Sequence, residues 1–83
     1  MEHYLIIARS VTHAQRMQRL LGRGGLRSQI FRAPRELTDL GCAYAVQIRQ
    51  SELAQALTLL HRERMEPVQI YLVQHGFYRE VSP

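Results

Sequence analysis

The chain has 83 residues, enough for one small domain with a thin core. A hydrophobic fraction of 46% argues against a disordered chain, and a single cysteine excludes an intramolecular disulfide. The net charge is +4, and all eleven cationic residues are arginines. Arginines suit phosphate and carboxylate, so nucleic acid or an acidic protein partner is conceivable, and RNA binding through the arginines would weaken steeply with salt. Because the arginines are spread along the sequence, a compositional bias explains them equally well. We therefore expect the charge mainly to support solubility, and we rank nucleic acid below protein partners.

The apolar run Tyr4–Ala8 near the N-terminus is too short for the core of a signal peptide or for a membrane span. We therefore expect a cytoplasmic protein that does not enter a membrane. In that reducing compartment the single thiol would stay free.

Hydrophobic periodicity predicts two strands and a helix in the first part of the chain. Tyr4–Ala8 is nearly continuous in β-forming residues, which is typical of a central strand. Ser10 is a good N-cap for the helix that follows, and Gly24 with Gly25 would end that helix. Residues 27–33 alternate between polar and apolar, which favours a strand at a sheet edge.

The second part of the chain predicts a turn, two strands and a helix. Residues 35–40 could form one helical turn, and residues 43–49 alternate as a strand does. Ser51 is the expected cap of a second amphipathic helix, and residues 68–73 form the last predicted strand. For residues 76–83 we predict no element.

The resulting order, β-α-β-β-α-β, predicts an α+β fold: a ferredoxin-like two-layer sandwich with an antiparallel sheet and both helices on one face. All 83 residues would belong to one domain, with the core at about residues 3–74 and a C-terminal tail at 75–83.

The segment 34–42 has the strongest chemical character, because it begins with proline and ends in a glycine and the lone thiol. In the predicted topology, the end of the first strand and the beginning of the third strand lie at the same sheet edge. The start of the first helix would therefore approach the thiol. The candidate site consists of Cys42 as the reactive group and of Arg35, Ser10, Thr12, His13 and Gly41 as stabilisers of its thiolate.

Activation of the thiol requires more than the helix. A thiol with a pKa near 8.5 is only about 3% thiolate at pH 7, and lowering that pKa to about 6.5 takes roughly 2.7 kcal/mol. A helix N-terminus contributes about 0.3–1 kcal/mol, whereas an arginine about 5.5 Å away adds on the order of 3 kcal/mol at an effective dielectric of 20. We therefore predict Arg35 as the main activator, with Arg9 and Arg32 as reserves.

Several other kinds of site find little support. The four histidines lack metal-ligand spacing and one cysteine cannot build a closed zinc site, so we expect no metal and no dissociable cofactor. An RNA-binding sheet of this topology would need stacking aromatic residues, and only Tyr4 and Tyr44 are candidates. Cys42 could also be a purely structural core residue.

The segment Pro34–Thr38, followed by Gly41 and Cys42, resembles the Pro-Arg-Glu-Ile-Ser…Cys-Gly signature of the DUF3343 family of selenium/sulfur carrier-like proteins. Residues 10–14 resemble the segment that follows the first strand in that family, and the similarity extends from about Tyr4 to Val73. The chain differs from the signature in having Ala43 after the cysteine.

The resemblance implies that Cys42 accepts sulfur or selenium from a donor protein, as a covalent persulfide or selenopersulfide, and relays it to an acceptor protein. With no second cysteine to close a disulfide, a carrier is favoured over a dithiol oxidoreductase, and a carrier or binding protein over a stand-alone enzyme. The alternative is a protein-interaction or oligomerisation module, such as a homodimer, in which Cys42 only packs. Its contact surface would be the open sheet face, with Tyr71, Val73 and Ala45.

Overall fold

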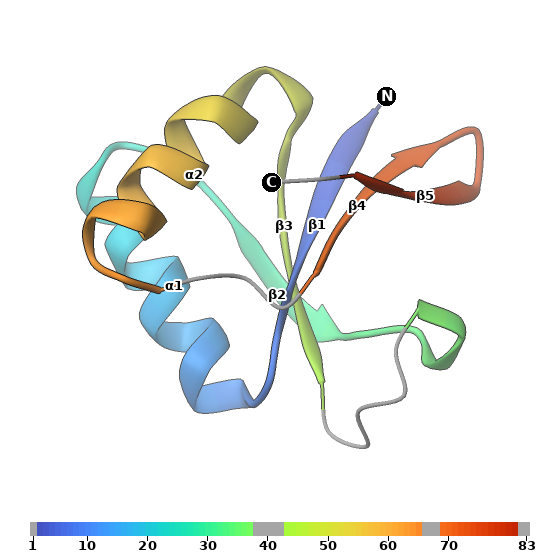
Figure 1. Cartoon of the computed structure of the whole chain (residues 1–83), viewed down its shortest axis with the longest axis horizontal. Coiled ribbons are helices and arrows are strands. Elements are labelled where there is room, and N and C mark those ends of the chain that lie inside the picture. Colours follow the sequence, from blue (N-terminus) through green and yellow to red (C-terminus); the bar gives the residue numbers. More distant parts are fainter. Residues whose placement is uncertain (1, 38–42, 66–68, 82–83) are drawn as a thin grey trace.

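The computed structural model describes residues 2–37, 43–65 and 69–81 and has two layers (Figure 1). A five-stranded antiparallel sheet carries both helices on one face and a short 3-10 turn on the other, as Figure 1 shows. This arrangement confirms the predicted α+β ferredoxin-like class. The elements, in chain order, are β1 His3–Ala8, α1 Val11–Arg23, β2 Gln29–Arg32, the 3-10 turn η1 Arg35–Leu37, β3 Tyr44–Arg49, the 3-10 turn η2 Gln50–Glu52, α2 Leu53–Arg62, β4 Gln69–Gln74 and β5 Phe77–Val81.

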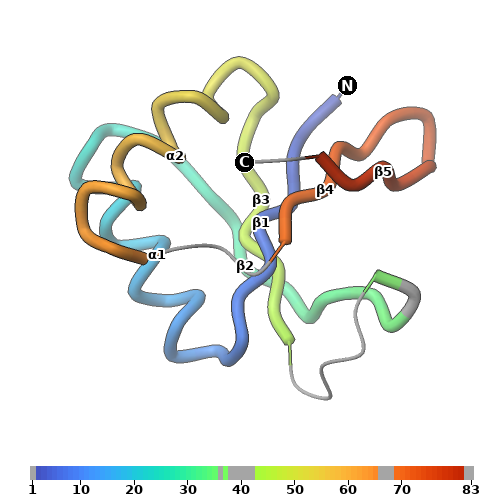
Figure 2. Tube along the Cα trace, in the orientation of Figure 1, coloured from blue at the N-terminus to red at the C-terminus, as the bar shows by residue number. Residues whose placement is uncertain are grey.

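The apolar strand β1 is the centre of the sheet. The strand order is β2-β3-β1-β4-β5, so β1 pairs with β3 and β4, and β2 lies at an edge as predicted. Ala8 is the register partner of Tyr44. The last residue of β1 and the first residue of β3 therefore lie side by side at the same end of the strands, as Figure 2 shows and as the topology predicted.

Helix α1 begins and ends as its sequence predicts. The hydroxyl oxygen of Ser10 accepts a hydrogen bond from the backbone N–H of His13 at 3.1 Å. At the other end the N–H of Leu26 donates to the carbonyl of Leu21, and Gly25 has φ +87°, a conformation that glycine adopts without strain.

Helix α2 begins later than predicted. Ser51 is not its cap, because residues 50–52 first form the turn η2, and the N-cap position falls on Glu52, whose side chain makes no capping hydrogen bond. The apolar stripe of the helix is as expected, with Ala56 and Leu60 buried.

The two faces of the sheet are covered by different cores. The helix-side core lies between the sheet and both helices. The loop-side core lies on the opposite face, under the segment that runs from β2 through η1 toward β3. The helix-side core consists of Ile6, Ala8, Ala14, Met17, Leu21, Leu26, Val46, Ile48, Ala56 and Leu60, and the loop-side core of Leu5, Ile7, Leu37, Ala43, Ala45 and Tyr71.

The loop-side core contradicts one expectation about the second sheet face. We expected Tyr71, Val73 and Ala45 to leave apolar surface for a partner, but Ala45 is fully buried and Tyr71 is only 8% exposed. Val73 is half-buried and packs against the same cluster. The prediction is wrong for Ala45 and Tyr71 because Leu37 and Ala43 cover this face.

Strand β5 is an addition to the predicted elements. His75 and Gly76 both have positive φ, and Gln74 pairs with Phe77, which makes a tight two-residue hairpin between β4 and β5. The signal in the sequence is Gly76 directly after the apolar strand. The strand has no buried face of its own, and its sequence includes Arg79 and Glu80. It therefore lacks the alternation of polar and apolar residues from which a strand is predicted.

Candidate functional site

The described residues on either side of the segment 38–42 are held against the sheet. Cys42 and Gly41 themselves lie outside the described residues. Leu37 and Ala43 are both buried in the loop-side core. The carbonyl oxygen of Leu37 accepts a hydrogen bond from the Tyr71 hydroxyl at 2.6 Å, and the N–H of Ala33 donates to the carbonyl of Ala43 at 3.1 Å. The two residues that flank the thiol-bearing segment, Leu37 and Ala43, are therefore fixed by packing and by hydrogen bonds.

A second part of the candidate site lies at the start of α1. Ser10 caps the helix, Thr12 is exposed and His13 is half-buried. These residues line a cavity of about 440 Å³, which we call the basic pocket; it is lined by Arg9, Ser10, Thr12, His13, Arg16 and Arg64. The structure thus places Ser10, Thr12 and His13 around one pocket and adds Arg16 and Arg64 to them.

The pKa of His13 reflects the positive charge of the basic pocket. Burial lowers the pKa of its imidazole below the ordinary value of 6.5, and the positive charges of Arg9 and Arg16 lower the pKa further. The His13 Nδ1 atom is shielded from solvent and has no hydrogen-bond partner among the described residues. The shift favours the neutral form of the imidazole, and the positive charges around it favour anions over cations.

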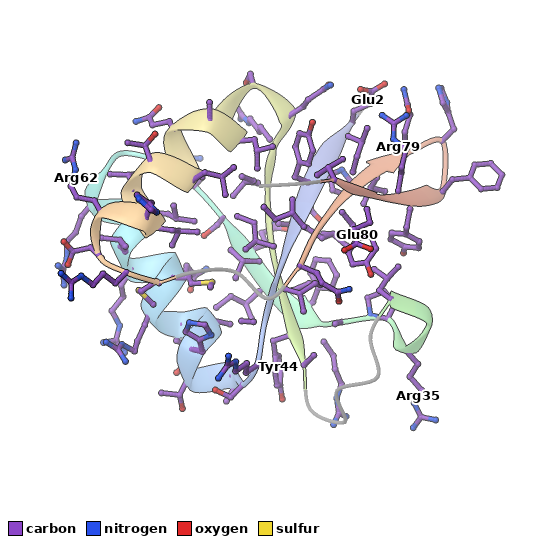
Figure 3. All side chains as sticks on the ribbon, viewed as in Figure 1. Glu2, Arg35, Tyr44, Arg62, Arg79 and Glu80 are labelled. Atoms are coloured by element: carbon purple, nitrogen blue, oxygen red, sulfur yellow. The ribbon has the colours of Figure 1, made fainter. Side chains whose placement is uncertain are left out.

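Arg35 does not line the basic pocket. It is exposed on η1, on the sheet face opposite α1, and Figure 3 shows it on the far side of the molecule from the helices. The reserve residues lie nearer the beginning of β3. Arg32 is the register partner of Tyr44, and Arg9 directly follows Ala8, the other partner of Tyr44.

The two added arginines differ in whether a local sequence pattern predicts their position. Arg16 lies one helical turn after Thr12, so the helical period could have placed it beside the candidate site. Arg64 follows α2, far along the chain, and no local pattern connects it to the start of α1.

The residues that the structure describes contain no cluster of three or more histidine, cysteine or acidic side chains able to hold a metal ion. Among the same residues, no helix has the length and apolar character to cross a membrane.

The fold is a two-layer α+β sandwich, and the sequence contains a single cysteine, so the chain is a small single-thiol protein. Residues 3–72 match the family model described as "Putative Se/S carrier protein-like". The chain therefore belongs to this Se/S carrier-like family, which confirms the resemblance drawn from the segments 10–14 and 34–42. The comparison with curated proteins found no match, and neither did the comparison with solved structures.

Proposed function

We propose that the protein carries one sulfur or selenium atom on Cys42 between a donor protein and an acceptor protein. The observation that carries this proposal is the family match, which spans the only cysteine of the chain. Membership of a carrier-like family also supports contacts with partner proteins.

The transfer needs no resolving thiol. The Cys42 thiolate attacks the terminal sulfur of a donor persulfide R–S–SH; a new S–S bond forms, the donor S–S bond breaks, and the donor thiolate R–S⁻ leaves. The product, Cys42–S–SH, gives its terminal sulfur to an acceptor thiolate by the same exchange, which regenerates the Cys42 thiolate. The selenium reaction has the same balance, with –SeH as the transferred group.

The fixed positions of Leu37 and Ala43, on either side of the thiol-bearing segment, support this role. A carrier must present its sulfur to two different proteins without losing its fold. Leu37 and Ala43 secure the segment through the loop-side core and through the hydrogen bonds of their carbonyl groups.

The arginines near the beginning of β3 support activation of the thiol. Arg9 and Arg32 flank Tyr44 through the strand register, whereas Arg35 is exposed on η1. We propose Arg9 and Arg32 as the main stabilisers of the thiolate, with Arg35 in a secondary role, because the backbones of Arg9 and Arg32 adjoin the beginning of β3, which directly follows the thiol-bearing segment in sequence. A guanidinium about 5.5 Å from a thiolate would contribute on the order of 3 kcal/mol at an effective dielectric of 20.

The decisive experiment measures the rate of Cys42 alkylation by iodoacetamide as a function of pH. We compare the wild type with Arg9→Gln, Arg32→Gln and Arg35→Gln, and we use Arg79→Gln on β5 as the matched control. A midpoint well below 8.5 that rises in the Arg9 or Arg32 variant supports an activated thiolate. An unshifted midpoint in every variant contradicts the electrostatic mechanism.

A loading experiment tests the carrier role directly. The reduced protein is incubated with inorganic polysulfide, and the mass of the intact protein is measured before and after addition of a thiol acceptor. We expect a gain of one sulfur atom that the acceptor removes and that Cys42→Ser abolishes. A wild-type protein that gains no sulfur, or that holds it irreversibly, rules out a carrier.

A further inference from the structure

We propose that the outer side of α1, together with the turn after α2, binds the phosphodiester backbone of a double-helical nucleic acid. This function does not depend on Cys42, although the surface shares Arg9 with the proposed thiolate site. The proposal rests on a surface that we call the arginine strip, which consists of Arg9, Arg16, Arg19, Arg23 and Arg64.

The arginine strip lines two adjoining hollows of the surface. The first hollow is the basic pocket, with Arg9, Arg16 and Arg64. The second has a volume of about 160 Å³ and contains Arg16, Arg19 and Arg23, so Arg16 belongs to both. Arginines that are spread along the sequence are thus gathered on one side of the molecule, where their fields add.

The spacing of the strip suits a repeating anion. Arg16, Arg19 and Arg23 are exposed at positions i, i+3 and i+7 of α1, which places them on one face of the helix. Neighbouring side chains on such a face are about 5–6 Å apart at Cβ. Flexible arginine side chains at this spacing can each contact a different phosphate, and the guanidinium group is suited to phosphate oxygens.

Arg64 occupies a position at which glycine would be more stable. Both helices end in the same hydrogen-bonded motif: Leu26 N–H donates to Leu21 and Met65 N–H donates to Leu60. The left-handed residue of this motif is Gly25 after α1 but Arg64, with φ +57°, after α2. A side chain in this conformation is disfavoured, and its presence in the basic pocket indicates that the charge serves a purpose other than stability.

The other lining residues favour nucleic acid over a protein partner. Among the described residues, Glu63 is the only acidic one that lines either hollow, and no Phe, Tyr or Trp lines them. The apolar members, Leu20 and Met65, are half-buried. Protein interfaces are enriched in aromatic residues and depleted of charge at their centre, whereas nucleic-acid interfaces are polar and strongly positive. Without aromatic residues to stack on unpaired bases, the strip fits a duplex backbone.

The test is fluorescence anisotropy with a labelled RNA hairpin and with a DNA duplex of the same sequence. We expect both to bind, because the contacts are to phosphates. The logarithm of the association constant should fall linearly with the logarithm of salt concentration, with a slope of about −2.7 to −4.5 for three to five neutralised phosphates. Arg16→Gln should weaken binding several-fold and reduce the magnitude of the slope by about 0.9.

Three further variants sharpen the test. Arg79→Gln removes an equal charge from β5, which lies far from the helices in Figure 3, and should leave the anisotropy curve unchanged. Cys42→Ser should bind as the wild type does, whatever the outcome of the sulfur-loading experiment. Arg64→Gly should weaken binding while raising the urea midpoint of unfolding, a combination that a merely structural role for Arg64 would not produce.

Four results of these binding experiments would overturn the proposal. The proposal is overturned if neither duplex binds at low salt, or if Arg16→Gln and Arg79→Gln weaken binding equally. Displacement of the hairpin by poly-glutamate at an equal concentration of charge would mean an acidic protein partner instead. Displacement by millimolar inorganic phosphate at constant ionic strength would mean a small-anion site, and would also overturn the proposal.

Discussion

The two faces of the sheet differ in how they are covered. On one face, two helices bury the side chains of β1 and β3 under a core in which Met17, Leu21 and Leu60 are completely buried. On the other face, a single 3-10 turn lays Leu37 over Ala45 and Tyr71. Figure 1 shows this asymmetry, with the helices on one side of the sheet and η1 on the other.

This difference indicates which side of the sheet stabilises the fold and which side holds the residues that flank the thiol-bearing segment. The helix side contains most of the buried apolar residues, and burial of apolar surface is the main stabilising contribution to folding. The loop side is smaller, and the residues that flank the segment 38–42 belong to it. We infer that the helix side holds the fold together while the loop side positions the thiol-bearing segment.

The largest expected effect comes from Leu21→Ala on the helix side. Leu21 is fully buried in α1, so the substitution should lower the free energy of unfolding by about 3–4 kcal/mol, through lost transfer energy and a cavity. Urea denaturation monitored by circular dichroism measures this loss. Val11→Ala in the same helix is the control: Val11 is 40% exposed, and its truncation should change the value by less than about 0.5 kcal/mol.

Leu37→Ala should have a smaller effect on stability and a larger one on the thiol. Leu37 is buried in the loop-side core at the edge of η1, where neighbouring groups can settle into the gap, so we expect a loss of about 2 kcal/mol, the low end for leucine truncation. The rate of Cys42 alkylation should rise, because one anchor of its segment is weakened. A loss of stability as large as that of Leu21→Ala, with an unchanged alkylation rate, would reverse our assignment of the two faces.

Tyr71→Phe tests the hydrogen bond that anchors the same segment. The Tyr71 hydroxyl donates to the carbonyl of Leu37 at 2.6 Å in a buried setting, so its removal should cost about 1–2 kcal/mol. The alkylation rate should rise less than in Leu37→Ala, because the apolar contact of Leu37 remains. Tyr78→Phe on β5 is the matched control, since Tyr78 is 39% exposed and should tolerate the change. Equal losses in the two variants would mean that the buried hydrogen bond has no special role.

Local patterns are sufficient for the strands β1 to β4, for α1 with its cap and for the apolar stripe of α2, but not for β5 or for the start of α2. The apolar run Tyr4–Ala8 could only be a central strand, and Ser10 caps α1 because its hydroxyl reaches an N–H three residues on. The pairing of Ala8 with Tyr44 then followed from topology. Each of these features depends on neighbours in sequence or on the alternation of strand directions.

The basic pocket and the loop-side core could not be predicted, because both depend on contacts between distant residues. Arg64 reaches the start of α1 only through the packing of α2 against α1, and no period in the sequence encodes that approach. Likewise, no local sequence pattern predicts that Leu37 packs against Tyr71, which lies 34 residues further along the chain. The reactivity of Cys42 stays a prediction, and the alkylation experiments address it.

The smallest expected effect, the titration of His13, tests the electrostatics of the helix side alone. Burial comes first, then the charges of Arg9 and Arg16, in lowering the pKa of this imidazole below 6.5. The other charged group that lines the same pocket is Arg64. Proton NMR of the His13 ring should therefore show a midpoint below 6.5 that moves upward, but not fully back, in Arg16→Gln.

The sign of the linked change in stability follows from the same shift. Because the folded state binds the His13 proton less readily than the unfolded state, the contribution of His13 to stability is complete above pH 6.5 and declines as the pH falls through the folded-state pKa. The imidazole is only half-buried, so the change should be small and detectable only as a difference between the wild type and His13→Gln. Leu37→Ala, on the other face, should leave the His13 midpoint where it is. A shift in that variant would mean that the two faces are electrostatically coupled through the sheet and that their roles are not separable.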